Sequence, residues 1–597
     1  MAVASLKNGC LGEKGFSSSK SFSNFQKTTP FGSIDTDARS EVESHIELPS
    51  LPELYILPDS EPQNAIPEVA LASFDEPSDE SVSAEGSSSS SSQAIEPNDV
   101  GFNSFTGPLL IKGNRFFDTV TGKYFAIRGV NYYPRPNTGP LDKNNLDLFS
   151  SEFKHIWKRD LQHLAALEAN VIRLYAVDPD VDHTEFMCAL QTKGIYVIVD
   201  LGANCEGCEI TPDAAPACYP ASYKMRGEKI IKQFARYDNV MAFSGGNEIN
   251  HRTGGNPWTW NAPCQKKFIR DMRAFIQACP SLRKIPVGLV VADTNRDENA
   301  QYYNCRTDEG DELENAQWYG INTYVHCDDI SDPSKATGFN MLRDSFKSYD
   351  YSIPVVLTEF GCVSISFPTI NGYEAQRTFH DAVFMNMPEY SDYFAGGVAF
   401  EYSTENANSM STSSYPFKTY GPQNYGLGYF SPKDCTDAGT NCTYERFPNF
   451  DYLQKAYKSY DGSGQPTLGT YTIPHSHSET SACPENSPIL NDFKWEGDSA
   501  PNESCPVEED AHYQCPLTPS LQDGSYRFLD DGSLGLQDES SRFQDGYIQL
   551  NEINASSNGL DSSLNSSIVT ESGAISRYDS ILVKLLISVL AVVALSE

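Results

Sequence analysis

The chain is poor in positive charge. Its 597 residues contain 44 Lys and Arg against 80 Asp and Glu, which gives a formal net charge of −36. Nucleic-acid-binding proteins display basic patches, and docking on anionic lipid needs clustered basic residues. The composition therefore argues against both functions. An acidic surface suits a protein that works in solution among neutral polymers.

Long apolar runs are also scarce. The nearest approach is the tail Ile581–Leu595, which is apolar apart from Lys584 and Ser588 and is shorter than a comfortable membrane span. Small residues at 572–574 and a polar stretch precede this tail. This layout predicts that residues 581–597 are a signal for attachment of a glycosylphosphatidylinositol (GPI) anchor. A short C-terminal membrane anchor is the alternative.

The N-terminus lacks the apolar core that a secretory signal peptide requires. Residues 1–104 are instead rich in Ser, Glu, Asp and Pro, with a serine run at 87–92. Such a segment buries too little apolar surface to offset its chain entropy, so we expect it to be disordered. Because the rest of the chain indicates secretion, we interpret the missing signal as an incorrectly assigned start codon.

Cysteine, by contrast, is plentiful, since the chain has 15 and all but Cys10 lie between Cys188 and Cys515. This content predicts disulfides formed in the secretory pathway. Cys205 and Cys208 could instead bind zinc, but no second cysteine pair or spaced histidine pair accompanies them, so we expect a local disulfide. Sequons for N-glycosylation occur at Asn441, Asn502, Asn554 and Asn565.

Residues 105–461 have a regular pattern. Eight apolar runs alternate with stretches of helical periodicity; the first ends near Asn131, and the others lie at 170–177, 194–201, 239–246, 285–293, 318–324, 353–360 and 394–402. Eight strands in βα alternation predict an α/β fold of the (β/α)8 TIM-barrel type. The alternative is a doubly wound open sheet, but the Gly-rich phosphate loop common in that fold is missing. Residues 462–580, rich in Ser and Asp with three cysteines, are interpreted as a linker or stalk.

Polar and phenolic side chains lie at the C-terminal ends of the predicted strands. In a TIM barrel these ends meet at one rim and carry the functional groups. The set comprises Asn131, Tyr132, Tyr133, Arg173, Tyr175, Asp200, Asn247, Glu248, Asp293, Asn322, Tyr324, Glu359 and Tyr402. For any single member, a solvated strand end is the alternative reading.

Two glutamates stand out in this set. Glu248 ends the segment Ser-Gly-Gly-Asn-Glu, and Glu359 lies in Leu-Thr-Glu-Phe-Gly-Cys, so each follows an apolar run. Two carboxyl groups facing each other across a barrel mouth are what a retaining glycosidase requires. We therefore expect Glu359 to be the nucleophile and Glu248 the acid/base, with Arg173 keeping Glu359 ionised. This chemistry needs no metal and no cofactor.

Several motifs in one order extend this reading. The segments NVIRLYAVDPDVDH, GIYVIVDL, GGNEIN, IPVGLVVAD, YGINTYVHC and VVLTEFGC, between about residues 116 and 457, resemble the successive motifs of glycoside hydrolase family 72. The resemblance implies a (β/α)8 barrel, retaining transfer of β-1,3-glucan and a GPI anchor. It also implies that β-1,3-glucan is both donor and acceptor, with the protein at the cell surface or in the cell wall. We expect a monomer.

The same resemblance assigns roles to individual residues. Glu248 would be the acid/base and Glu359 the nucleophile. Binding or support of the sugar would fall to Tyr132, Tyr175, Asp200, Asn247, Asp293, Tyr324 and Tyr402. Cys327 would pair with Cys362, and Cys305 with Cys435 or Cys442.

The chain also departs from the family. A segment with three cysteines at 203–220 replaces a shorter loop, and the loop at 254–263 adds Trp258 and Trp260, which could form an acceptor subsite or pack within the loop. The usual partner of Cys188 is missing. Two other functions stay open: an endo-β-1,3-glucan hydrolase, and a catalytically silent, GPI-anchored surface protein that binds glucan.

Overall fold

The computed structural model describes residues 105–135, 146–252, 256–435, 442–477 and 480–516, together with the short strands at 526–528 and 534–536. The N-terminal segment 1–104, the tail 581–597 and three sequons, those of Asn441, Asn554 and Asn565, lie outside the described residues. None of the helices in the described part has the length and apolarity to cross a membrane.

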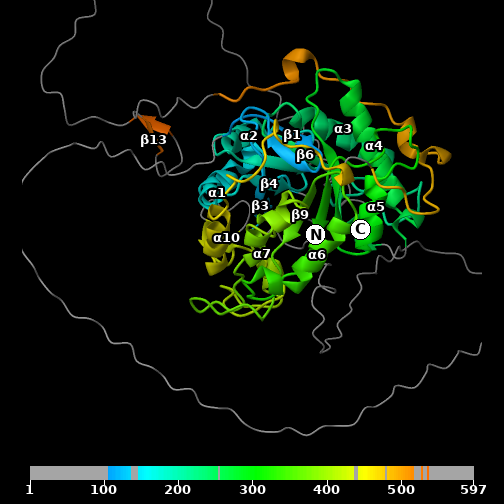
Figure 1. The fold of residues 1–597 in the computed structure, drawn as a ribbon. Helices are drawn as coiled ribbons and strands as arrows, with labels where there is room; N and C mark the ends of the chain where they lie inside the picture. Colours follow the sequence, from blue (N-terminus) through cyan, green and yellow to red (C-terminus); the bar gives the residue numbers. More distant parts are fainter. Residues whose placement is uncertain are drawn as a thin grey trace, which may run out of the picture. The chain divides into compact units, whose positions relative to one another are not determined.

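Eight parallel strands close into a barrel, which confirms the predicted (β/α)8 fold (Figure 1). Each strand pairs with its neighbours in chain order, and β10 closes the ring against β3. The strands are β3 (Ile127–Tyr132), β4 (Val171–Leu174), β5 (Tyr196–Asp200), β6 (Val240–Asn247), β7 (Val287–Ala292), β8 (Tyr319–Asn322), β9 (Val355–Phe360) and β10 (Gly396–Ala399). Nearly every strand residue is buried, as expected for parallel strands covered on both faces.

Side chains alternate between the inside and the outside of the barrel, because successive strand residues point to opposite faces. On β3, Ile127 belongs to the cluster that fills the barrel interior, whereas Val130 and Tyr132 pack in the outer layer beneath the helices. Val171 on β4 and Ile198 on β5 also point inward. Polar residues at the strand ends therefore reach the mouth only when they share the inward register.

Helices surround the barrel (Figure 1). They are α1 (Lys154–Ala166), α2 (Thr184–Gln191), α3 (Ala221–Phe234), α4 (Ala262–Ala278), α5 (Arg296–Asn304), α6 (Thr337–Ser348), α7 (His380–Phe384), α8 (Pro388–Ser391), α9 (Asn406–Ser409) and α10 (Pro448–Lys458). Short 3-10 turns include Ile249–Arg252 and Pro257–Thr259, both after β6. Helix α10 begins at Pro448, with Asp451 in its first turn and Lys455 in its last, an arrangement that suits the helix dipole.

A hairpin of β1 (Leu109–Lys112) and β2 (Arg115–Asp118) lies at the N-terminal end of the barrel strands. Its residues Leu109 and Phe116 join the interior cluster and so close that end of the barrel. A turn follows β2, closed by a hydrogen bond from the N–H of Gly122 to the carbonyl of Asp118, and beyond it Tyr124 forms a single bridge with Phe117.

The interpretation of residues 462–580 as a stalk is wrong for the part that the structure describes. Three disulfides fasten this segment to the helices of the barrel: Cys188–Cys515, Cys279–Cys505 and Cys305–Cys483. Trp495 and Leu490 of the segment are buried in the outer core. We call residues 480–516 the strap; it runs over the outside of the barrel beside α4 and α5 (Figure 1).

Other cysteines pair within the barrel domain, and one of these disulfides joins Cys218 to Cys264. Cys327 is joined to Cys362, as the family resemblance implied, but Cys305 pairs with Cys483 of the strap, and Cys435 pairs with Cys442 across the β11–β12 hairpin (Gly428–Ser431 and Thr443–Arg446). The expected pairing of Cys305 with either of those cysteines is therefore wrong. Cys205 and Cys208 form the expected local disulfide.

A second unit, residues 523–597, is described only through its hairpin of β13 (Tyr526–Phe528) and β14 (Leu534–Leu536).

Candidate active site

The two glutamates lie at the C-terminal ends of strands that depart from regular pairing at that point. On β6 the register with β7 shifts between Ser244 and Asn247, and on β9 the register with β8 shifts just before Glu359. A bulge re-aims the side chains that follow it. These irregularities set the direction of the two carboxyl groups. Glu248 is 7% exposed, and Glu359 is fully buried.

Glu248 has a left-handed backbone, with φ of 52°, which is uncommon for a residue with a side chain. Its N–H donates to the carbonyl of Val290 at 3.0 Å, which holds this conformation in place. Two residues before Glu248, a Cβ on Gly246 would lie 2.7 Å from Oε1 of Gln265, so that side chain would have to move to make room for it. The Gly-Gly-Asn-Glu sequence therefore reflects the tight passage of this strand end across α4.

Glu359 receives hydrogen bonds at both carboxyl oxygens. The Tyr324 hydroxyl donates to Oε2 at 2.8 Å, and an Arg173 guanidinium nitrogen lies 3.4 Å from Oε1. The Tyr175 hydroxyl is 3.1 Å from Oε1 but closer, at 2.6 Å, to Oδ1 of Asn131, so these two acceptors share its single hydrogen. Tyr324 is thus the most direct hydroxyl donor to Glu359.

Arg173 is the centre of this network. It forms a two-point ion pair with Asp200, at 2.6 and 3.2 Å, and also donates to Oδ1 of Asn247 at 3.0 Å. The guanidinium is fully buried and extends from the inward face of β4 beneath the carboxyl pair. A buried cation with carboxylate partners stays charged, so Arg173 supplies a fixed positive charge next to Glu359.

Asparagine side chains connect Glu248 to the network around Arg173. Asn322, at the end of β8, donates to Glu248 Oε1 at 2.9 Å and to Asn247 Oδ1 at 3.2 Å. Its own oxygen accepts from the hydroxyl of Thr358 at 2.8 Å, which fixes the orientation of the amide. Glu248 is therefore held by one neutral donor, in contrast to Glu359.

The carboxyl groups influence each other's ionisation. Burial raises the pKa of Glu248, and burial followed by the negative charge of Glu248 raises the pKa of Glu359. Two such groups titrate as a pair. The Arg173 guanidinium and the hydrogen bond from Tyr324 oppose the rise in the pKa of Glu359, and the hydrogen bond from Asn322 opposes the rise at Glu248. A retaining mechanism requires one member of such a pair to be protonated and the other ionised.

Two of the expected sugar-binding residues do not reach the site. Tyr132 is fully buried in the outer layer, and its hydroxyl donates to Asp160 of α1 at 3.1 Å. Tyr402 is also fully buried and stacks on Tyr444, with ring centroids 4.4 Å apart. The assignment of Tyr132 and Tyr402 to substrate binding is therefore wrong, because both side chains point away from the barrel mouth.

Asp293 also has a different environment from the one expected. Its carboxylate forms a two-point pair with Arg296 of α5, at 2.6 and 2.7 Å, and accepts from the Thr323 hydroxyl at 2.6 Å. These contacts satisfy both oxygens and connect the end of β7 to the next helix. In contrast, Tyr175, Asp200 and Asn247 surround the carboxyl pair, as expected.

Glu401 was missed by the sequence reasoning, which chose its neighbour Tyr402. Burial raises the pKa of Glu401 to about 7, and its charge acts on Tyr175. The signal that could have identified it is the pair Glu-Tyr at the end of the eighth apolar run, where only one of two adjacent residues can face inward.

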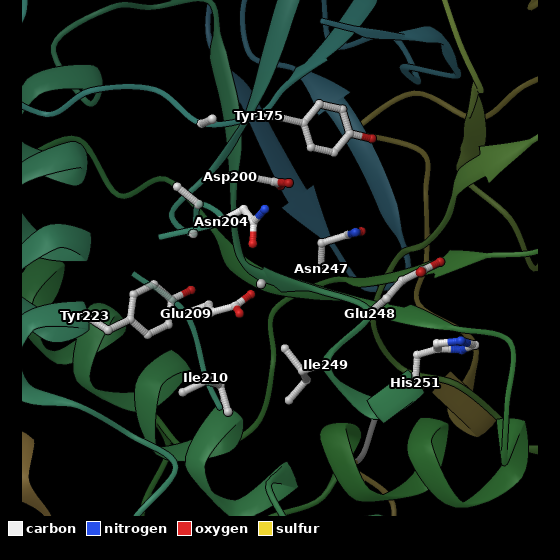
Figure 2. A pocket seen from close by; sticks show the side chains of 14 residues that line it. Tyr175, Asp200, Asn204, Glu209, Ile210, Tyr223, Asn247, Glu248, Ile249 and His251 are labelled. Atoms are coloured by element: carbon white, nitrogen blue, oxygen red, sulfur yellow. The ribbon is translucent and has the colours of Figure 1, made fainter. Parts of the chain in front are cut away.

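His251 was missed as well. It lies in the 3-10 turn Ile249–Arg252 and lines the same cavity as Glu248 (Figure 2). A positive charge on His251 lowers the pKa of Glu248, against the raising effect of burial.

The two tryptophans in the loop beyond Glu248 differ in their surroundings. Trp258 is buried and stacks against Tyr302 of α5, with ring centroids 6.1 Å apart, so it packs within the loop. Trp260 is 44% exposed and remains free to contact a ligand. Among the described residues, no cluster of three or more His, Cys, Asp or Glu side chains is arranged to hold a metal ion.

Comparison with known proteins gives a consistent result. The glucanosyltransferase family, glycoside hydrolase family 72, matches residues 99–412, which is more than half of the chain. The 1,3-beta-glucanosyltransferase GAS5 of Saccharomyces cerevisiae is 35% identical over 51% of this chain and 58% of that protein. The 1,3-beta-glucanosyltransferase gas4 of Schizosaccharomyces pombe is 32% identical over 66% of this chain and 74% of that protein. The chain thus spans between about half and three quarters of the length of these relatives.

Among solved structures, Saccharomyces cerevisiae Gas2p in complex with laminaripentaose is similar, with a TM-score of 0.50 and 26% identity. The match covers 67% of this chain and 78% of the Gas2p chain.

Proposed function

The chain belongs to glycoside hydrolase family 72, and from this membership we propose that it is a retaining 1,3-beta-glucanosyltransferase. It would cleave a β-1,3-glucan and transfer the donor segment to a second glucan chain. The observation that carries the proposal is the unequal environment of the two carboxyl groups: Arg173 and Tyr324 serve Glu359, whereas Asn322 serves Glu248. One scaffold thus provides a nucleophile and an acid.

The first half of the reaction forms a covalent intermediate. A carboxylate oxygen of Glu359 attacks the anomeric carbon of the donor, and the bond from that carbon to the glycosidic oxygen breaks. Glu248 gives its proton to the departing oxygen. Asn247 Oδ1 is already held by Arg173 and Asn322, so the amide nitrogen is the group available to donate to the sugar's 2-hydroxyl.

The second half transfers the donor. Glu248, now ionised, takes the proton from a hydroxyl of the acceptor glucan, whose oxygen attacks the anomeric carbon and releases Glu359. Water in place of that hydroxyl would give hydrolysis from the same intermediate. The ratio of transfer to hydrolysis therefore depends on how well the acceptor sugar excludes water.

The proposal extends to location and assembly. The disulfide-rich fold supports an extracellular position, and the composition of the tail at 581–597 supports a GPI anchor at the cell surface or in the cell wall. N-glycosylation at Asn502 is compatible with the structure, because this residue is exposed and uses its Oδ1 to accept from Lys224. We propose that the enzyme acts as a monomer that remodels wall glucan.

The test is a digest of one reduced laminari-oligosaccharide by the purified enzyme, with chain length and anomeric configuration of the products resolved. Products longer than the substrate, with retained β configuration, are expected. Exclusively shorter products would make the protein an endo-β-1,3-glucan hydrolase, and unchanged substrate would leave a silent binding protein.

The nucleophile is tested separately. Glu359→Gln should abolish turnover while oligosaccharide binding persists, because the amide keeps the shape of the carboxyl group but cannot form the glycosyl ester. Glu445→Gln, a change at an exposed carboxylate on β12, is the matched control and should leave turnover intact. Normal turnover in the Glu359 variant would remove the nucleophile assignment.

A further inference from the structure

A cavity of about 310 Å³ lies at the end of the barrel opposite the two glutamates. Its walls come from the last turns of α4, from the connection 279–286 that leads into β7, and from the connection 305–318 that leads into β8. These connections enter the N-terminal ends of the strands, whereas the functional groups of a TIM barrel gather at the C-terminal ends. The cavity is therefore separate from the site around Glu248 and Glu359.

The lining of this cavity is positively charged. Arg273, Lys284 and Arg306 line it, and Glu312 is the only carboxylate among the described residues that do so. Within the described part of the chain, none of the three cations forms an ion pair with a carboxylate. The lining thus has three positive charges against one negative charge, whereas the chain as a whole has a net charge of −36.

One residue, Asn315, binds both guanidinium groups. Arg306 donates from Nε to the side-chain oxygen of Asn315 at 3.1 Å, and Arg273 donates to the carbonyl oxygen of the same residue. Burial, followed by the positive charge of Arg306, lowers the pKa of Arg273 to about 10. The two cations are therefore close enough to repel each other, and an anion bound to both would relieve this repulsion.

Several hydrogen-bond donors at the cavity have no acceptor among the described residues. Arg306 uses its Nε alone, so both terminal nitrogens remain. Lys284 donates to two carbonyls at the end of α4, which leaves one of its three hydrogens. Gln317 accepts from the N–H of Val287 with its side-chain oxygen at 2.9 Å, so its amide nitrogen remains. A ligand for this cavity must therefore be rich in acceptors.

A phosphate monoester has the matching chemistry. Its two negative charges balance the excess of positive charge, and its oxygens accept two-point hydrogen bonds from guanidinium groups. Ile276, Ile285 and Leu313 also line the cavity and offer apolar surface to an attached organic group. The volume is at the lower end of the range for small-molecule sites, so it suits an ester of about the size of a hexose.

We propose that this cavity binds a phosphate monoester of a small organic molecule, such as a sugar phosphate, and that Arg273, Arg306 and Lys284 hold the phosphate. The proposal does not depend on the transferase activity, because the lining residues of this cavity are distinct from those around Glu248 and Glu359.

The test is calorimetric titration of the purified protein with glucose 6-phosphate, with inorganic phosphate and gluconate as comparison probes. We expect saturable binding of the ester, with both comparison probes binding more weakly. Arg306→Gln should weaken binding of the ester about tenfold or more, because it removes charge-assisted hydrogen bonds. Arg446→Gln removes the same charge from an exposed position on β12 and is the matched control, which should bind as the unaltered protein does.

A conservative variant guards against a folding defect. Arg306→Lys keeps the charge and loses the two-point geometry, so its affinity should fall between those of the unaltered protein and Arg306→Gln. The ester should also raise the melting temperature of the unaltered protein and of Arg446→Gln more than that of Arg306→Gln. No saturable binding to the unaltered protein, equal weakening in Arg306→Gln and Arg446→Gln, or gluconate bound as tightly as the ester would overturn the phosphate site. These outcomes leave the transferase proposal untouched, since the oligosaccharide digest tests it separately.

Discussion

Replacing Tyr324 by Phe isolates one interaction of Glu359, the proposed nucleophile. The hydroxyl donates to Glu359 Oε2 at 2.8 Å, while the ring packs edge-on against Tyr425 with centroids 5.7 Å apart. Phe retains this packing and removes only the hydroxyl. The variant therefore reports the value of a single hydrogen bond to the ionised carboxyl group.

The size of the effect follows from the charge of the acceptor. A hydrogen bond to a charged group contributes about 1.5–3 kcal/mol, which corresponds to a factor of about 10 to 150 in the equilibrium between ionised and protonated Glu359. Losing it raises the pKa of Glu359 further above its ordinary value. Since Glu359 must be ionised to act as the proposed nucleophile, the acidic limb of the pH profile of kcat/KM should move to higher pH.

The assay is the pH dependence of kcat/KM on one laminari-oligosaccharide. We expect Tyr324→Phe to lose about 10- to 100-fold in kcat/KM on the acidic side of the optimum, with a smaller loss above it. Tyr351→Phe is the control, since that hydroxyl is buried and donates to the carbonyl of Ala300, remote from the carboxyl pair. An acidic limb that coincides with that of the unaltered enzyme would refute the reasoning.

Three further outcomes are expected. Arg173→Met should lower the free energy of unfolding by about 3–5 kcal/mol, because it leaves Asp200 buried without its partner, and adding Asp200→Asn should recover part of this loss in chemical denaturation. Burial raises the pKa of Glu401 to about 7 in the folded protein. The protonated carboxyl group therefore stabilises the fold fully below about pH 4.5, and this contribution is lost as the pH rises through 7. The melting temperature should fall from pH 5 to pH 8, and it should fall less in Glu401→Gln. Replacing Cys188 and Cys515 by Ser opens a link across 327 residues and should cost about 2–5 kcal/mol, whereas the same change at Cys205 and Cys208, three residues apart, should cost far less in thermal unfolding.

The barrel and the reacting pair were predictable because each signal is local in the sequence. Apolar runs of strand length show where the strands lie, and the glutamates follow two of these runs directly. Parallel strands bring their C-terminal ends together whatever connects them. The contact between Arg173 and Glu359 could be anticipated for the same reason.

The direction of individual side chains was not predictable in this way. Tyr132 directly follows Asn131, and both were placed at the rim, yet only one of two adjacent strand residues can face inward. The register is decided by the packing of Ile127 and Val130 on opposite faces of β3. At Glu359 the bulge on β9 alters the register, so simple alternation would have misled there too.

The strap was misread because composition does not report cross-links. Residues 462–580 are rich in Ser and Asp, a composition typical of a linker, and their cysteines all lie within the strap. Their three cysteines reach partners between 178 and 327 residues away. Disulfide connectivity cannot be deduced from spacing alone, so this part of the fold emerged only from the structure.

The division of roles between the two glutamates depends on their surroundings rather than on the residues themselves. Both are buried carboxyl groups, and in isolation either could hold the shared proton. Asp200 orients Arg173, and Arg173 and Tyr324 donate hydrogen bonds to Glu359, whereas Asn322 donates to Glu248. We therefore expect the choice of nucleophile to be set by Arg173 on β4 and by Tyr324, just beyond β8. Changes at these supporting positions should shift the proton between the glutamates even where both carboxyl groups are intact.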